Sequence, residues 1–175
     1  KLEITDAIGS TGEEVLLKLQ GRATKNVYFD INADANRRGV IRFKSAGTDK
    51  WSIGRGDSDE LSDSSFFITN GSGGGNTAKF VITSAGSVGI NSTVPETRLD
   101  VVESSASRNW TPTSNVTALF ERSSGSVITL VSNTSSVVGI DFADTGDNNR
   151  GFIKYDHNDD SMFFRTNADE QLRIT

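Results

Sequence analysis

The chain of 175 residues has no cysteine, one histidine and two prolines. Without cysteine it can form no disulfide, zinc–thiolate centre or thiol nucleophile. The single histidine, His157, excludes a metal site built on a pair of histidines. No apolar run approaches the roughly 20 residues that a membrane-spanning helix needs, so we expect no membrane insertion. The net charge of -5 argues against nucleic-acid binding through a broad basic surface.

The abundant residues favour strands and turns. The chain contains 22 Ser, 17 Thr and 17 Gly, and 15 Asp against 8 Glu. Good helix formers are scarce while β-branched and turn residues are common, so the composition predicts an all-β fold. Apolar residues make up 34% of the chain. This low content predicts a small core within one chain and a need for partner chains to cover apolar surface.

Two parts of the chain match each other in the same order, which indicates an internal repeat. The matching segments are 17–19 with 128–130, 36–43 with 148–155, 65–70 with 162–167, and 79–83 with 171–175. We therefore predict two repeats, 1–97 and 98–175, each truncated within the repeat at its outer end. The chain is then expected to be a segment of a longer repetitive protein.

Several segments alternate apolar and polar residues, the pattern of half-buried strands. They are 28–31, 99–101, 139–142 and 171–174. Segment 126–131 is also predicted as a strand, and its match in the first repeat makes 17–20 a strand too, with a short helical turn before it left open. Each is expected to place its apolar residues on one face of a sheet. We also predict acid–base pairs between neighbouring strands, Asp30 with Arg42 and Asp141 with Lys154. Each pair is worth at most about 1 kcal/mol, so it is a signal of register more than a source of stability.

Several motifs suggest chemistry but fit solvated turns better. Acidic clusters at 57–63 and 156–160 offer a structural calcium site as an alternative, yet neither has the order of an EF-hand loop. The glycine-rich segment 71–76 precedes a strand, so it predicts a hairpin tip and not a phosphate cradle. The tripeptide Arg55-Gly56-Asp57 and the lone His157 are interpreted as turn residues. We expect no catalytic residue, no cofactor and no metal.

Residues 80–101 read FVITSAGSVGINSTVPETRLDV. This segment resembles the repeat of long bacteriophage tail fibres found in marine and cyanobacterial phages. That repeat runs as a strand, then Ser-x-Gly-x-Val-Gly-Ile-Gly, Thr-x-x-Pro and Lys-Leu-x-Val. In this chain Asn91 replaces the last Gly of Ser-x-Gly-x-Val-Gly-Ile-Gly. The spacing from Thr93 to Pro95 is one residue shorter than in Thr-x-x-Pro. The resemblance covers most of the chain.

The resemblance implies tandem β-hairpin or β-sandwich-like repeats in an elongated, homotrimeric, all-β fibre. It implies an extracellular virion protein, a tail fibre with a structural role in host attachment and no enzymatic one. The partners would be further copies of the chain, other virion tail proteins, and a host-surface glycan or protein receptor. Many relatives end in a self-cleaving trimerisation chaperone like that of endosialidases.

Receptor recognition would fall on loops, because loops vary while strands maintain the shaft. The two repeats differ most at 57–63, 71–76 and 108–113. The candidate receptor-facing residues are Asp57, Asp59, Asp63, Gly73, Asn76, Arg108 and Trp110. Two alternatives remain open: a secreted or cell-surface bacterial adhesin built from the same repeat, and a polysaccharide-cleaving tailspike module.

Overall fold

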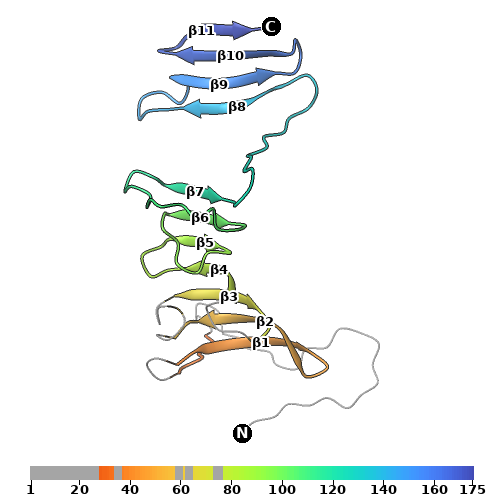
Figure 1. Cartoon of the computed structure of the whole chain (residues 1–175), viewed down its shortest axis with the longest axis vertical. Coiled ribbons are helices and arrows are strands. Elements are labelled where there is room, and N and C mark those ends of the chain that lie inside the picture. The colour runs from red at the N-terminus through yellow and green to blue at the C-terminus, as the bar shows by residue number, and fades with distance from the viewer. Residues whose placement is uncertain (1–27, 34–36, 58–60, 62–64, 73–76) are drawn as a thin grey trace, which may run out of the picture. The chain divides into compact units, whose positions relative to one another are not determined.

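The structure is a computed structural model that describes residues 28–33, 37–57, 61, 65–72 and 77–175. These residues form an almost entirely β structure (Figure 1), which confirms the all-β prediction. Among them, no helix is long and apolar enough to cross a bilayer. The chain divides into two compact units, unit 1 (Lys1–Ser124) and unit 2 (Gly125–Thr175).

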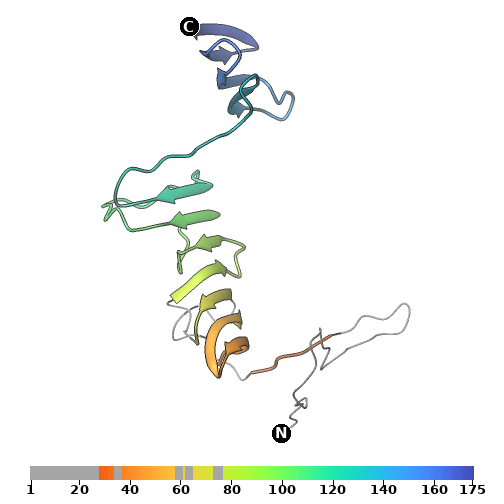
Figure 2. The ribbon, with the colours of Figure 1, turned by 90° about the vertical axis from the view of Figure 1, so that its right-hand side faces the viewer.

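The strands of unit 1 are β1 Gly39–Ser45, β2 Thr48–Arg55, β3 Phe66–Asn70, β4 Ala78–Ile82, β5 Val88–Ile90, β6 Leu99–Val102 and β7 Ala118–Glu121. They form one seven-stranded sheet in the order of the sequence (Figure 2). Strands β1 to β5 pair antiparallel, whereas β5 with β6 and β6 with β7 pair parallel. Each parallel pair requires the chain to cross back over the sheet. Loops 91–98 and 103–117 make these two crossings.

The strands of unit 2 are β8 Val137–Phe142, β9 Gly151–Asp156, β10 Ser161–Thr166 and β11 Asp169–Ile174. They form a four-stranded antiparallel sheet in sequence order. Successive hairpins therefore build this sheet, as predicted. The described part of each unit holds a single sheet, so neither unit forms a sandwich by itself.

Tight turns fix the register of two hairpins. Ala46 (φ 46°) and Gly47 (φ 76°) join β1 to β2, and Asn167 (φ 50°) and Ala168 (φ 66°) join β10 to β11. Positive φ at both central residues matches the right-handed twist of the flanking strands. Two-residue turns leave little freedom to slide one strand along the other, so the side chains that share a face are determined.

One face of the unit 1 sheet is apolar across every strand. Register places one row of side chains side by side from β1 to β7: Ile41, Ile53, Ile68, Phe80, Ile90, Val101 and Phe120. We call this surface apolar face 1. Ile41, Ile90 and Phe120 are 44%, 44% and 45% exposed, so the chain's own described residues leave the row partly uncovered.

The opposite face of unit 1 is covered by the chain itself. Phe67 and Val81 are fully buried on this side. Loop 91–98 lies so close to β5 that a Cβ on Gly89 would collide with the carbonyl oxygen of Ser92. The crossing required by parallel pairing thus covers one face and leaves the other open.

Unit 2 shows the same division between its faces. On one side the row Ile140, Ile153, Phe164 and Leu172 crosses all four strands, and we call it apolar face 2. Ile140 and Leu172 are 53% and 51% exposed. Because no described segment covers this row fully, it is a second open apolar surface.

Long cationic side chains cover the other face of unit 2. The Lys154 ammonium lies 4.3 Å from the centre of the Phe152 ring, and the Arg173 guanidinium lies 4.6 Å from that of Phe163. Lys154 also pairs with Asp141 at 2.7 Å, which confirms one predicted acid–base pair. Cations over aromatic faces are favourable and shield the rings from water. Phe152 is consequently only 7% exposed in a sheet one layer thick.

The meanders β1–β4 and β8–β11 share their strand order and register. Their row residues correspond strand by strand, Ile41, Ile53, Ile68 and Phe80 with Ile140, Ile153, Phe164 and Leu172. Each has a β-bulge between its last two strands, after Ile68 and after Phe164. The sequence match aligned β1 with β9, whereas the strand order aligns β1 with β8. The repeat boundaries 1–97 and 98–175 stay a prediction.

Some local predictions were wrong. Residues 28–31 and 126–131, predicted as strands, belong to no strand of the described structure. Arg42 does not pair with Asp30 and instead lies 4.0 Å from Asp49. An alternating pattern shows which residues of a segment would share a face. It does not show whether another backbone lies beside the segment, and a strand needs such a neighbour to pair with its N–H and C=O groups. The predicted strand 17–20 lies outside the described residues.

We expect Gly89→Ala to destabilise unit 1 by about 1–3 kcal/mol, because the new methyl group would push loop 91–98 away from β5. Gly125→Ala is the matched control, since no atom lies within 4 Å of its Cβ position. Urea unfolding followed by circular dichroism measures both. Equal stability of the two variants would contradict the close contact between loop 91–98 and β5.

Candidate functional site

A pocket lies on the covered face of unit 1, where the two crossover loops meet. Its volume is about 390 Å³, within the range of roughly 300–1,000 Å³ typical of ligand pockets. Its lining comes from loop 91–98, from β6 and β7, and from residues 105–111 of the second loop. We call it the crossover pocket, because parallel pairing places both loops over the same face.

Asp100 of β6 lines the crossover pocket and is only 2% exposed. Its Oδ2 accepts hydrogen bonds from the Ser92 hydroxyl at 2.9 Å and the Glu96 backbone N–H at 3.1 Å. Its Oδ1 is enclosed and has no hydrogen-bond donor among the described residues. A buried polar atom without a partner is costly, so a donor that reached this oxygen would be stabilised.

Arg108 ties the two crossover loops to β7. Its guanidinium donates to Glu96 Oε1 at 2.6 Å and to Glu121 Oε2 at 2.9 Å. The remaining nitrogen, Nη1, donates to the backbone carbonyl of Trp110 at 2.6 Å. Glu121 in turn accepts the backbone N–H of Ala106 at 2.7 Å. One guanidinium thus fixes the position of both loops relative to the sheet.

Trp110 lines the same pocket and is 56% exposed. The guanidinium carbon of Arg108 lies 5.0 Å from the centre of its ring, a distance at which cation and ring attract each other. The ring is therefore held from one direction while more than half of the residue stays open to solvent. It forms a preformed aromatic surface beside a group of carboxylates.

The ion pair between Arg108 and Glu121 shifts the pKa values of both residues. Hydrogen bonding to its guanidinium holds the pKa of Glu121 below the usual value of 4.5. The contact with Glu96, followed by that with Glu121, raises the pKa of Arg108. Both shifts favour the charged forms, so the Arg108–Glu121 ion pair is complete at neutral pH.

The apolar faces are the second feature suited to interaction. Among the described residues, 22 large apolar side chains are exposed and five apolar residues are buried. Beside apolar face 2, Ile128 and Leu130 line a groove together with Val138 and Ile153. Contiguous exposed apolar surface in a soluble protein marks a place where another molecule binds. Both faces are therefore candidate contact surfaces between chains.

The structure brings two of the sequence-predicted receptor-facing residues together, Arg108 and Trp110, in the crossover pocket. Asp57 is 8% exposed and lies 3.4 Å from Arg38, so its interpretation as part of a solvated turn was wrong. Pairing with a cation compensates the charge of this buried carboxylate. The other candidates, Asp59, Asp63, Gly73 and Asn76, lie outside the described residues.

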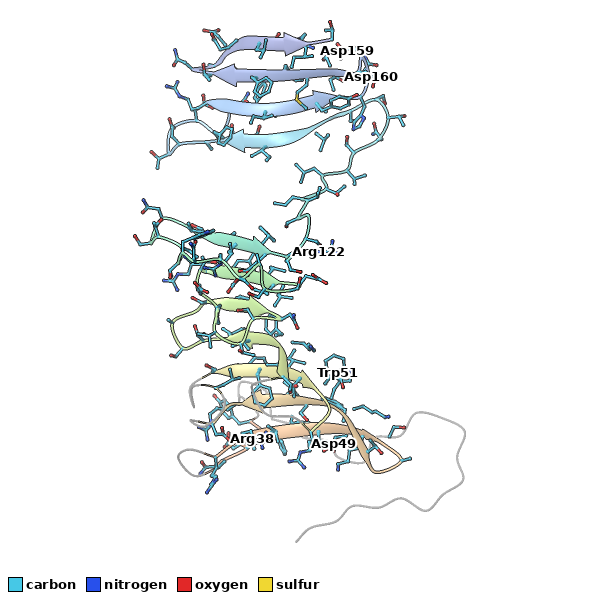
Figure 3. All side chains as sticks on the ribbon, in the orientation of Figure 1. Arg38, Asp49, Trp51, Arg122, Asp159 and Asp160 are labelled. Carbon is cyan, nitrogen blue, oxygen red and sulfur yellow. The ribbon has the colours of Figure 1, made fainter. Side chains whose placement is uncertain are left out.

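The acidic turn between β9 and β10 carries Asp159 and Asp160 (Figure 3). Asp159 lies 3.4 Å from Arg173, and Asp160 accepts a hydrogen bond from the Tyr155 hydroxyl at 2.9 Å. This hydrogen bond raises the pKa of Tyr155. In the part of the chain that the structure describes, no group of three or more acidic or histidine residues could hold a metal ion.

Sequence reasoning missed Glu96, Asp100 and Glu121 as pocket residues. It did place Asp100 on the face opposite Leu99 and Val101, which the register confirms. It did not predict that β5, β6 and β7 pair in parallel, and only parallel pairing brings two loops over that face. The only signal in the sequence was that Asp100 and Glu121 each follow an apolar residue, and this pattern does not indicate which residues lie beside them.

Comparison with known proteins does not place the chain in a family. No protein-family model matches it, and no curated protein matches it. Its function is therefore inferred from its residues and their contacts.

We expect loop 103–117 to loosen in acid. The pKa of Glu121 is lower in the folded chain than in the unfolded one, so its ion pair with Arg108 is fully stabilising above pH 4.5 and is lost as pH falls through the lowered folded pKa. The Trp110 indole N–H resonance, assigned with Trp51→Phe, should move with a midpoint below 4.5.

Glu121→Gln should reduce this acid transition, whereas Glu170→Gln, which removes a similar pair with Arg173 in unit 2, should leave it unchanged. A Trp110 transition that is the same in Glu121→Gln and the unsubstituted chain would contradict the assignment.

Proposed function

We propose that the chain is a shaft segment of a bacteriophage tail fibre in which three copies bury their apolar faces against one another. The observation that carries this proposal is the row of apolar side chains from Ile41 to Phe120, which crosses all seven strands of unit 1. A row that is continuous over a whole sheet, and exposed in one chain, is stabilised when other chains cover it.

The narrowness of the sheet at β5 and β6 favours three chains over two. Strands β5 and β6 have three and four residues, which correspond to about 10–13 Å at roughly 3.3 Å per residue. Successive strands lie about 4.8 Å apart, so the sheet grows in the perpendicular direction as strands are added. Two facing strips would leave both long margins open to water. Three strips close on themselves and enclose one apolar interior.

The opposite faces suit the outside of such a shaft. In unit 1 the crossover loops and their ion pairs cover this side, and Arg108 alone makes two of those pairs. In unit 2, Lys154 and Arg173 lie over the aromatic rings on this side. Each chain therefore already gives one face a polar cover, and the apolar face is the one that needs a partner.

The tail-fibre assignment is supported by the segment that resembles the phage repeat. Residues 80–101 include β5, the first crossover loop and the start of β6, where the chain changes from antiparallel to parallel pairing. The recurrence of one four-stranded meander suits a shaft built by repetition. In this proposal the segment is extracellular, joins other tail proteins and supports attachment to a host receptor. The proposal assigns it no catalytic step.

The native mass of the chain should be about three times 18.8 kDa. Light scattering on a sizing column measures it, and circular dichroism shows whether the particle is folded. A folded particle of one chain would contradict the proposal and favour an adhesin made of independent units. Loss of polysaccharide viscosity on adding the protein would instead favour the tailspike module.

Ile90→Asp should reduce the native mass to that of one chain. Ile90 is 44% exposed in the single chain, so an aspartate there is solvated before assembly but buried and unpaired after it. Val94→Asp is the control, because Val94 is 77% exposed in loop 91–98 on the covered side. Retention of the trimeric mass by Ile90→Asp would show that apolar face 1 is not the contact surface.

A further inference from the structure

We infer that the crossover pocket binds an uncharged saccharide residue, with Trp110 as the surface on which the sugar ring stacks and Asp100 as an acceptor for its hydroxyl groups. The pocket is formed by one chain, so this inference does not rest on the tail-fibre proposal. It also lies on the face opposite the row that contains Val101 and Phe120, so burial of apolar face 1 would leave it accessible.

The charges of the pocket determine the class of ligand. Glu96, Asp100 and Glu121 line it together with one cation, Arg108, which leaves a formal charge of −2. A negative potential repels phosphate, sulfate and acidic sugars such as sialic acid. Carboxylate oxygens are acceptors only, so they select a ligand rich in O–H or N–H donors.

Arg108 cannot reverse this preference. Its Nε, Nη1 and Nη2 already donate to Glu121, to the Trp110 carbonyl and to Glu96, each within 2.9 Å. Its side chain is 14% exposed. A guanidinium engaged in this way holds the loops in place and offers little to an incoming anion.

Asp100 supplies the acceptor that the folded chain leaves unused. It is 2% exposed, its Oδ2 holds loop 91–98 through Ser92 and Glu96, and its Oδ1 has no donor among the described residues. A neutral hydroxyl that reaches this enclosed oxygen, which requires a shift of the residues around it, donates to it without bringing a charge out of water. The desolvation cost of a neutral donor is much smaller than that of a cation.

Trp110 supplies the apolar contact that a sugar also needs. The C–H groups on one side of a pyranose ring form a flat apolar surface, and an indole is the largest flat side chain that can cover it. Trp110 is 56% exposed, and Arg108 lies against its ring at 5.0 Å. The surface is thus held in position before a ligand arrives, which lowers the entropy lost on binding.

The test is a titration of the whole chain with a panel of uncharged saccharides: methyl glucoside, galactoside and mannoside, and oligomers of N-acetylglucosamine. Sialyllactose and glucose 6-phosphate serve as anionic probes. Binding is followed by saturation-transfer NMR and by the Trp110 indole resonance, with Trp51 as an internal reference. At least one neutral saccharide should shift Trp110 and not Trp51, and both anionic probes should bind at least about tenfold more weakly.

Trp110→Ala and Asp100→Asn should each weaken the binding by about tenfold or more. Their matched controls are Tyr28→Ala, an aromatic side chain in a residue that is 72% exposed, and Asp141→Asn, an exposed carboxylate of β8. Both controls should bind as the unsubstituted chain does. If Asp100→Asn does not fold, Trp110→Ala still tests the site, because Trp110 is 56% exposed and lies outside the strands in loop 103–117.

The inference is overturned if no neutral saccharide of the panel shifts Trp110 at about 10 mM. It is equally overturned if binding survives Trp110→Ala or if the anionic probes bind as tightly as the neutral ones. A trimeric mass without saccharide binding would leave the shaft proposal intact and remove this one. Saccharide binding by a folded monomer would leave this inference intact and remove the shaft proposal.

Discussion

A sheet one layer thick has two faces, and the described residues of this chain cover only one of them. The remaining structure follows from that constraint. The covered side holds the few buried apolar residues, Phe67 and Val81 among them, and the ion pairs of Arg108. The open side holds a row of apolar side chains that continues from strand to strand in both units. Free energy is gained when apolar surface leaves water, at about 25 cal/mol per Å². In the proposed shaft, that gain comes from assembly with other copies more than from folding of one chain.

The change from antiparallel to parallel pairing after β5 gives unit 1 its pocket. A parallel neighbour can be reached only if the chain returns across the sheet, and loops 91–98 and 103–117 do so in succession. Both returns lie on the side that carries Asp100 and Glu121, and the space between them is the crossover pocket. Unit 2 has no parallel pair, and long cations cover its corresponding face. The same need, a polar cover for one face, is met by loops in one unit and by side chains in the other.

These two solutions have different consequences for ligands. In unit 2, Lys154 and Arg173 lie directly on aromatic rings, and each cation is in contact with the ring beneath it. A face covered by two loops contains a cavity wherever the loops diverge. Arg108 of the second loop ties the first loop and β7 together through contacts with Glu96 and Glu121, and Trp110 lies at its side. The proposed shaft assembly and the proposed saccharide binding therefore use opposite faces of one sheet, and neither needs to disturb the other.

The sequence by itself determined the fold class and much of the strand content. Alternation around Asp100 and through 171–174 describes side chains on the two faces of a strand, which is a local property of the backbone, and both segments are strands. It also singled out Arg108 and Trp110, because 108–113 is one of the segments in which the two predicted repeats differ most. Only the tertiary structure decided that 126–131 remains outside the sheets, that β1 corresponds to β8, and that three strands pair in parallel. These outcomes depend on which distant backbone each segment meets, and a one-dimensional pattern of polarity contains no information about that partner.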